Sequence, residues 1–323
     1  MKNSITILFA VIIFAASSCG TSSEKKENKT NISDLKGNIS ISGAFALYPL
    51  AQKWADEFCK LNPNVKIDVS AGGAGKGMTD ALSGLVSLGM VSREISKEEI
   101  DKGAWFIPVT KDAVVPIVNV NNPVLQQLLN KGLDKETLKK IFLTGSVTDW
   151  GAAIKNGKIK GKINVYTRSD ACGAADVWAK YLGKKQEDII GTAVSGDPGI
   201  TEAVKNDKLG IGYNNIGYAY DATSKYVVSG IKILPIDFNG NGMIDDKEYF
   251  YQHKDSIVRA IKDGRFPSPP ARDLYFVCKD QPKDKVVVEF LKWVLTDGQK
   301  YVSDAGYINL SEEKINTALG RLK

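Results

Sequence analysis

Hydrophobic residues alternate or recur at helical spacing in an order that predicts an α/β protein. Near residue 40, Ile39 and Ile41 alternate with polar residues as in a strand, and Leu50, Trp54 and Phe58 then recur along one helix face. The strand-like segments VKIDVS and VSLGMV follow, with the helical segment MTDALSGL between them. This order of strand, helix, strand, helix and strand predicts a parallel sheet covered by helices.

The same alternation continues through the rest of the chain. AVVPIVNV and LYFVC are predicted strands that could cross between two lobes, and INVYTR, KLGIGYNN and IKILPI are further predicted strands. Helices are predicted over PVLQQLLNKGLDKETLKKIFL with a break at Gly132, over KDSIVRAIKDG, and over KVVVEFLKWVLTDGQKYVSDAG. The length of 323 residues is enough for two such α/β lobes.

The N-terminus has the features of an export signal. An apolar run from Ile5 to Ala16 follows Lys2 and is short for a membrane span, and the small residues ASS precede Cys19. This arrangement resembles the bacterial lipoprotein cleavage box, which implies a signal peptide over 1–19 and a lipid on Cys19. Residues 20–36 are polar and are expected to form a disordered tether. The alternative is an uncleaved anchor helix. In both cases we expect an extracytoplasmic protein held at a bacterial membrane, without knowing which leaflet carries the anchor.

Charge and cysteine content exclude some classes of partner. The formal net charge of +6 is spread along the chain, so no nucleic-acid-binding stripe is expected. Beyond Cys19, the odd set Cys59, Cys172 and Cys278 cannot pair completely, and whether Cys59 and Cys278 pair is left open. The only histidine, His253, is expected at the surface. We expect a monomer.

Three stretches of small residues each end a predicted strand and open a predicted helix. They are SGAFALYP (42–49), SAGGAGKG (70–77) and RSDACGAA (168–175). The first amides of a helix lack internal partners and carry partial positive charge, so such loops can bind an anion, and Arg168 adds a fork of donors. Each loop could equally be a plain tight turn. A nucleotide-binding P-loop does not fit, because Ser70 replaces its first glycine and Gly77 follows Lys76.

These loops and their surroundings resemble the phosphate-type substrate-binding lipoproteins of bacterial ABC importers. The resemblance spans about Gly37 to Leu310 and includes ISGAFALYPLAQKWADEF, NVYTRSDACGAADVW and ARDLYFVCK. It implies a two-lobed class II periplasmic-binding-protein fold, with mixed sheets flanked by helices and the ligand in the interlobe cleft. Residues 37–115 plus about 271–323 would form lobe 1, and about 116–270 would form lobe 2. It also implies an ABC permease as partner and no enzymatic activity.

Carried over residue by residue, the resemblance gives a candidate anion site with few hydroxyl groups. Ala44, Phe45 and Ala46 stand where many members have a hydroxyl-rich run in the first loop, and Ala74 replaces a serine in the second. In the third loop, Cys172 and Ala174 replace a serine and a threonine. Lys76, Asn214 and Asn215 are candidate replacement donors, and Cys172 is either a weak thiol donor or a space-filler. Phosphate, another oxyanion, a different anionic solute and a sensing or partner-binding role all remain open. The candidate site residues are Ala44, Phe45, Ala46, Ala74, Gly75, Ser92, Arg93, Arg168, Asp170, Cys172, Gly173 and Ala174.

A separate twelve-residue segment, DFNGNGMIDDKE, has the pattern of an EF-hand calcium loop. Oxygen ligands occupy the first, third, fifth, seventh, ninth and twelfth places, and Gly242 occupies the sixth, where the chain turns sharply. A structural Ca²⁺ is therefore expected, with a turn that binds nothing as the alternative. The predicted ligands are Asp237, Asn239, Asn241, the Met243 carbonyl, Asp245 and Glu248.

No catalytic set is evident in the sequence. A Ser-His-Asp triad would have to use His253, which lies close after the predicted calcium loop and follows no nucleophile motif. An extracytoplasmic hydrolase of phosphoesters remains as the enzymatic alternative. We expect a binding protein.

Overall fold

The computed structural model describes residues 35–323. The predicted signal peptide, the lipidation site Cys19 and nearly all of the predicted tether therefore lie outside the described residues. Within residues 35–323, no helix is long and apolar enough to cross a membrane.

The first elements form a parallel α/β unit, as the hydrophobic pattern predicts. Strand β1 pairs in parallel with β2 on one side and with β3 on the other. Helix α1 has Pro49 in its first turn and buries Leu50, Trp54 and Phe58, as their spacing predicts. The elements are β1 (Gly37–Gly43), α1 (Tyr48–Leu61), β2 (Val65–Ala71), α2 (Ala74–Leu82), β3 (Leu88–Val91) and α3 (Lys97–Asp101).

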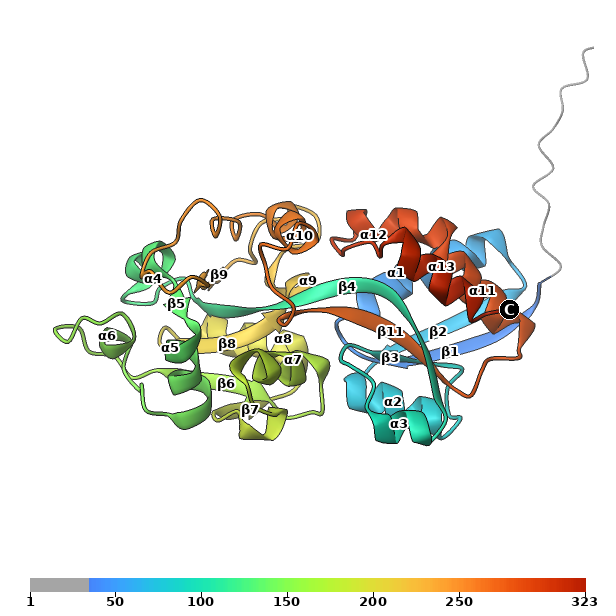
Figure 1. Cartoon of the computed structure of the whole chain (residues 1–323), viewed down its shortest axis with the longest axis horizontal. Coiled ribbons are helices and arrows are strands. Elements are labelled where there is room, and N and C mark those ends of the chain that lie inside the picture. Colours follow the sequence, from blue (N-terminus) through green and yellow to red (C-terminus); the bar gives the residue numbers. More distant parts are fainter. Residues whose placement is uncertain (1–34) are drawn as a thin grey trace, which may run out of the picture. The chain divides into compact units, whose positions relative to one another are not determined.

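Two long strands connect this unit to the rest of the fold (Figure 1). The first part of β4 (Ala104–Asn119) pairs antiparallel with β11 (Ala271–Lys279), and its second part pairs with β8 (Gly210–Asn215) and β9 (Ile231–Ile233). The main sheet has the strand order β2-β1-β3-β11-β4-β8-β6-β7, in which β6 is Asn164–Arg168 and β7 is Thr192–Val194. Both predicted crossing strands are confirmed, although β4 begins before the predicted Ala113, in a segment where Pro108 and Lys111 interrupt the apolar pattern.

The middle of the chain builds the second lobe. Gly132 ends a helix as predicted, but a short strand and a π-helical turn replace much of the predicted continuation. The elements are α4 (Leu125–Lys131), β5 (Leu133–Asp134), α5 (Lys135–Lys139), the π-helix Lys140–Thr144, α6 (Trp150–Ala153), β6 (Asn164–Arg168), α7 (Gly173–Leu182), the 3₁₀ turn Gln186–Asp188, β7 (Thr192–Val194), α8 (Gly196–Asn206), α9 (Ile216–Ala219), β10 (Ile236–Asp237) and α10 (Lys254–Lys262).

The C-terminal region differs from the single long helix predicted there. It contains α11 (Lys285–Leu295), a 3₁₀ turn (Asp297–Gln299) and α12 (Lys300–Asp304). The break lies at Thr296, whose φ of −115° and ψ of −97° are not helical, and the carbonyl of Gly298 in the following turn accepts a hydrogen bond from Trp54 Nε1 of α1 at 2.8 Å. Helix α13 (Glu312–Gly320), capped by Ser311, has no counterpart among the predicted elements.

Separate hydrophobic cores lie in the two lobes. Trp54, Phe276 and Phe290 belong to the core that α1 and α11 cover. Trp178 and Tyr213 belong to another, where their rings stack with centroids 6.0 Å apart. Truncating a fully buried aromatic such as Trp178 to alanine typically costs about 3–5 kcal/mol, so each core is a substantial source of stability.

Candidate functional site

The three predicted anion loops lie against one another. Gly75 N, at the start of α2, donates to Ala171 O in the loop before α7 at 2.9 Å. A side chain on Gly173 would collide with the carbonyl and hydroxyl oxygens of Ser92, which follows β3. A side chain on Gly196 would lie 3.1 Å from the Phe45 ring. The fold therefore brings the predicted loops together around the ends of β1, β2, β3 and β6.

Several backbone amides at these loops have no hydrogen-bond acceptor within residues 35–323. They precede or open helices α1, α2 and α7, where no earlier turn offers a carbonyl. Among them are the amides of Phe45, Ala46, Ala74, Gly173 and Ala174. Apart from Phe45, these five residues are alanine or glycine, which let another group approach the amide nitrogens closely.

Arg168, at the end of β6, is held by two carboxylates. Its Nε and Nη2 donate to Asp170 at 2.8 and 2.6 Å, and its Nη1 donates to Asp197 at 2.7 Å. Burial alone would lower the pKa of Arg168, but the carboxylates of Asp197 and Asp170 outweigh that effect and raise it. A guanidinium has five N–H groups, so two remain after these bonds. Phe45 covers the guanidinium, 5.3 Å from its ring centroid.

A buried hydrogen-bonded chain connects Arg168 to the crossing strand β11. Asp197 accepts from both the backbone and the side-chain amide of Asn215. Asn215 in turn accepts from Arg272 on β11, and Arg272 Nε donates to Ser92 O at 3.2 Å. This series of hydrogen bonds thus joins the loop after β3 to the loop after β6. Asp197 and Arg272 are not among the predicted site residues, although Asp197-Pro198 at a helix start is a recognisable signal.

Other predicted donors are already bound within the protein. Arg93 makes a two-pronged ion pair with Glu99, and Lys76 pairs with Asp80. Asn214 Nδ2 donates to Asp197 O at 2.9 Å and to a neighbouring threonine hydroxyl. The Ser92 hydroxyl, by contrast, makes no hydrogen bond within the part of the chain that the structure describes.

Cys172 is neither a donor to the site nor only a space-filler, the two roles expected from the sequence, because it caps a helix. Its sulfur accepts a hydrogen bond from Ala175 N at 3.3 Å and so caps the start of α7. Burial raises the pKa of the Cys172 thiol to about 12, so the thiol is neutral. Among residues 35–323, all three cysteines, Cys59, Cys172 and Cys278, are free thiols. His253 is also a cap, at the start of α10, rather than a freely solvated side chain.

A buried carboxylate lies beside this network. Asp112 on β4 is opposite Arg272 on β11, with Oδ2 3.6 Å from Arg272 Nη2. Neither oxygen of Asp112 has a hydrogen-bond partner. Burial raises the pKa of Asp112 to about 6, although the Arg272 charge acts in the opposite direction. Lys254 also faces Asp112, and burial lowers the pKa of Lys254 to about 8.

The predicted calcium loop is ordered by its own backbone amides. Asp237 accepts from Gly240 N and Gly242 N at 2.7 and 2.8 Å, and Gly242 has a φ of 83°. Glu248 accepts from Phe238 N at 2.7 Å. Asp237 and Glu248 are each only 4% exposed. Across the described residues, no three acidic, cysteine or histidine side chains converge as a metal site. The oxygen donors suit a hard cation chemically, but they would have to exchange amide partners for it.

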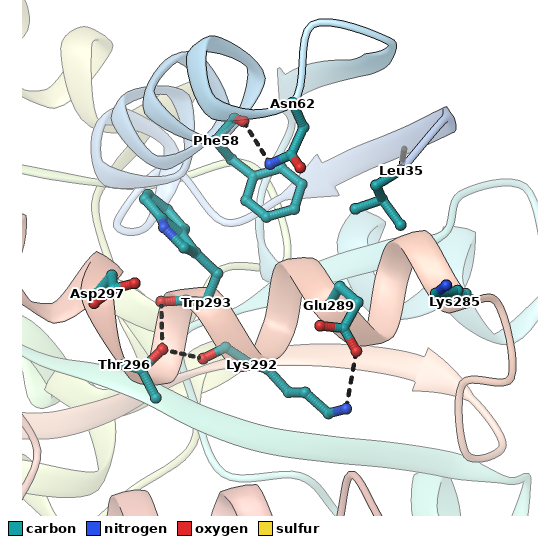
Figure 2. Close-up of a pocket in the computed structure, with 9 residues that line it drawn as sticks. All are labelled: Leu35, Phe58, Asn62, Lys285, Glu289, Lys292, Trp293, Thr296 and Asp297. Carbon is teal, nitrogen blue, oxygen red and sulfur yellow. Dashed lines mark hydrogen bonds and ion pairs between the residues drawn. The ribbon is translucent and has the colours of Figure 1, made fainter. Parts of the chain in front are cut away.

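A cavity of about 460 Å³ lies away from the three loops, between α1 and α11 (Figure 2). Phe58 and Trp293 form an apolar wall, and Lys292 bonds to Glu289 at the rim. No residue of the predicted anion site lines this cavity, so we do not assign the anion to it.

Comparisons with known proteins agree with the fold. Residues 25–298 match the family model described as a PBP superfamily domain. The chain belongs to this family. It is 27% identical over 325 residues to the phosphate-binding protein PstS of Staphylococcus haemolyticus, covering 98% of this chain and 95% of the relative. It is 28% identical over 298 residues to PstS of Staphylococcus epidermidis, covering 90% and 84%.

Solved structures show the same fold. A substrate-binding protein of Clostridium perfringens with bound phosphate superposes with a TM-score of 0.69 at 22% identity, covering 85% of this chain and all of that one. An ABC-type phosphate transport receptor of Vibrio cholerae gives 0.60 at 19% identity, covering 84% and 100%. The predicted two-lobed class II binding-protein fold is thus confirmed. The family is one of binding proteins, in agreement with the expectation that the chain is not an enzyme.

Proposed function

We propose that the protein is an extracytoplasmic receptor, tethered through a lipid on Cys19, that binds phosphate or a related oxyanion and delivers it to an ABC importer. The observation that carries the proposal is the set of unpaired amides at Phe45, Ala46, Ala74, Gly173 and Ala174. Helix starts of this kind bind anions through fixed N–H groups. The names of the staphylococcal relatives support phosphate as the ligand class.

The donors that remain can compensate for the missing hydroxyl groups. A hydrogen bond to a charged group contributes about 1.5–3 kcal/mol, so a few well-placed amides supply a useful affinity. Two N–H groups of Arg168 and the Ser92 hydroxyl add to them. Arg168 is fixed by its carboxylates before any ligand arrives, so little side-chain entropy is lost on binding.

Calorimetry with the purified protein tests this function. Phosphate, sulfate and tungstate would be titrated in turn, and at least one is expected to bind with a 1:1 stoichiometry. A substitution of Arg168 is expected to weaken this binding. Arg265→Ala is the matched control for that substitution, because Arg265 also pairs with an aspartate but lies on the exposed surface. Silence from every oxyanion would contradict the proposal and favour a cleft that serves sensing or partner binding.

We also propose that residues Asp237 to Glu248 bind a structural Ca²⁺. The order of oxygen donors and the left-handed Gly242 support this. Ile244 N donates to Asn130 O at 2.9 Å, and β10 pairs with β5 beside the loop, so an ion here would fasten the loop to the second lobe.

A further inference from the structure

We propose that Lys254 is a positioning residue of the anion site, which holds the second lobe against the first and so slows the release of a bound oxyanion. Its ammonium group binds a backbone carbonyl of the first lobe, and the residue two positions further along that segment holds the first anion loop. This inference rests on the proposed function and concerns the same site. Lys254 itself makes no contact with the anion.

Lys254 reaches from one lobe to the other. It begins α10 in the second lobe, and its ammonium donates at 3.0 Å to the carbonyl of Ala305, directly after α12 of the first lobe. The two helices face each other across the lobes (Figure 1). Lys254 is only 2% exposed. Burial lowers the pKa of Lys254 to about 8, although the charge of Asp112 acts in the opposite direction, so the side chain is mostly an ammonium ion at pH 7.

The segment after Ala305 is shaped around this lysine. Gly306 has a φ of 78°, and a side chain there would lie 2.1 Å from Lys254 Cε. Glycine is therefore needed at this position both for the backbone conformation and for space. The ring of Tyr307 follows, with its centroid 5.7 Å from the Lys254 ammonium, which is within the range of a cation–π contact.

Tyr307 extends this contact to the first anion loop. Its buried hydroxyl donates to Ala46 O at 2.8 Å, and the hydroxyl of Tyr218 on α9 donates to Phe45 O at 3.2 Å. The peptide groups on both sides of Ala46 are thus held by tyrosine hydroxyls. Because a peptide group is planar, fixing the Phe45 oxygen also fixes the direction of the Ala46 amide, one of the unpaired donors.

The unpaired amides of the site come from both lobes. Those of Phe45, Ala46 and Ala74 belong to the first lobe, and those of Gly173 and Ala174 belong to the second. An anion held by both sets leaves only when the lobes move apart, and that movement also breaks the bond from Lys254 to Ala305. A hydrogen bond from a charged group is among the stronger ones, so its loss should speed release by about tenfold or more.

A second lysine also joins the lobes but lies at the surface. Lys180 on α7 pairs with Glu94, in the loop after β3, at 2.9 Å, and their side chains are 42% and 81% exposed. Exposed pairs of this kind contribute little, because water and salt screen them. Lys180→Met is therefore the matched control for Lys254→Met, since each change removes an ammonium group that spans the two lobes.

The test measures phosphate binding to the purified protein by stopped-flow fluorescence, with sulfate and tungstate as the next probes if phosphate does not bind. Lys254→Met keeps an unbranched apolar side chain and removes the ammonium group. It should release the anion at least about tenfold faster, with an association rate within about threefold of wild type. Lys180→Met should release it within about twofold of the wild-type rate. A general structural defect would instead reduce the fraction of protein that binds.

Tyr307→Phe removes one hydroxyl and tests whether Lys254 acts along the same series of contacts. The double variant should speed release by less than the product of the two separate effects, because both changes act on the position of one segment. A full product, or an unchanged release rate in folded Lys254→Met, overturns the inference while the proposed function stands. If Lys254→Met does not fold, an unchanged release rate in Tyr307→Phe overturns it. If none of the three oxyanions binds the wild type, the proposed function fails, and the inference with it.

Discussion

Arg168 Nη1 lies 2.7 Å from Asp197 Oδ2 in a pair that is almost completely buried. Arg168 therefore contributes to the stability of the fold as well as to the proposed anion site. Removing one partner of a buried ion pair usually costs about 3–5 kcal/mol, because the other charge stays in the interior. The contribution of Arg168 to anion binding thus has to be measured separately from its contribution to stability.

We predict that Arg168→Met lowers the free energy of unfolding by about 3–5 kcal/mol and weakens oxyanion binding by at least about tenfold. The double variant Arg168→Met with Asp197→Asn should recover part of the stability, since one carboxylate no longer lacks a partner, but none of the binding. Urea denaturation and calorimetry measure the two effects. Recovered binding in the double variant would show that Arg168 supports the fold only.

Gly173→Ala should weaken anion binding, and it should lower the free energy of unfolding by less than Arg168→Met does. A Cβ at Gly173 would meet the Ser92 carbonyl and hydroxyl oxygens, so α7 and the loop after β3 would have to move apart. Gly157→Ala is the control, because a Cβ there meets no other atom within 4 Å. Equal anion affinities for the two variants, measured by calorimetry, would argue against a site at the start of α7.

Asp112 should make stability depend on pH. Its pKa rises from 3.8 to about 6 on folding, so the folded state holds the proton more tightly. The stability that protonated Asp112 contributes is full below about pH 4 and is lost as pH rises through about 6, a change of about 3 kcal/mol. Relative to wild type, Asp112→Asn should gain that amount between pH 4 and pH 8 in urea denaturation series. Parallel pH profiles would refute the assignment.

Calcium should raise the melting temperature of the wild type, and Glu248→Gln should remove most of that rise, because Glu248 supplies the carboxylate at the twelfth place. Asp246→Asn is the matched control, since Asp246 is exposed in the same loop at a place that is not a ligand. Differential scanning calorimetry with and without calcium measures both. A full calcium response in Glu248→Gln would show that the ligand assignment is wrong.

The elements that the sequence predicted well are those whose own residues decide their structure. Leu50, Trp54 and Phe58 mark the buried face of α1 without reference to any other part of the chain. The signal for α13 is also local, because Ser311 precedes two glutamates at the start of the helix. By contrast, the turn after the break at Thr296 is held by a contact that is not local, because the Gly298 carbonyl accepts a hydrogen bond from Trp54, which is distant in the sequence.

The candidate site also has features that the local sequence predicts and features that depend on distant contacts. Small residues before predicted helices indicated where free amides would lie, and Arg168 was evident beside them. The chain from Asp197 through Asn215 to Arg272 could not be predicted, because only the pairing of β4 with β8 and β11 brings these residues together. The capping role of Cys172 depends on where α7 begins, and sequence patterns locate helix ends only approximately.

A crystal structure of the protein grown with phosphate tests the central claim most directly. The account predicts density for one anion whose oxygens lie about 2.7–3.2 Å from the amide nitrogens of Phe45, Ala74 and Gly173, with Arg168 still bound to Asp197. Phosphate bound elsewhere, with these amides turned to other acceptors, would contradict the account.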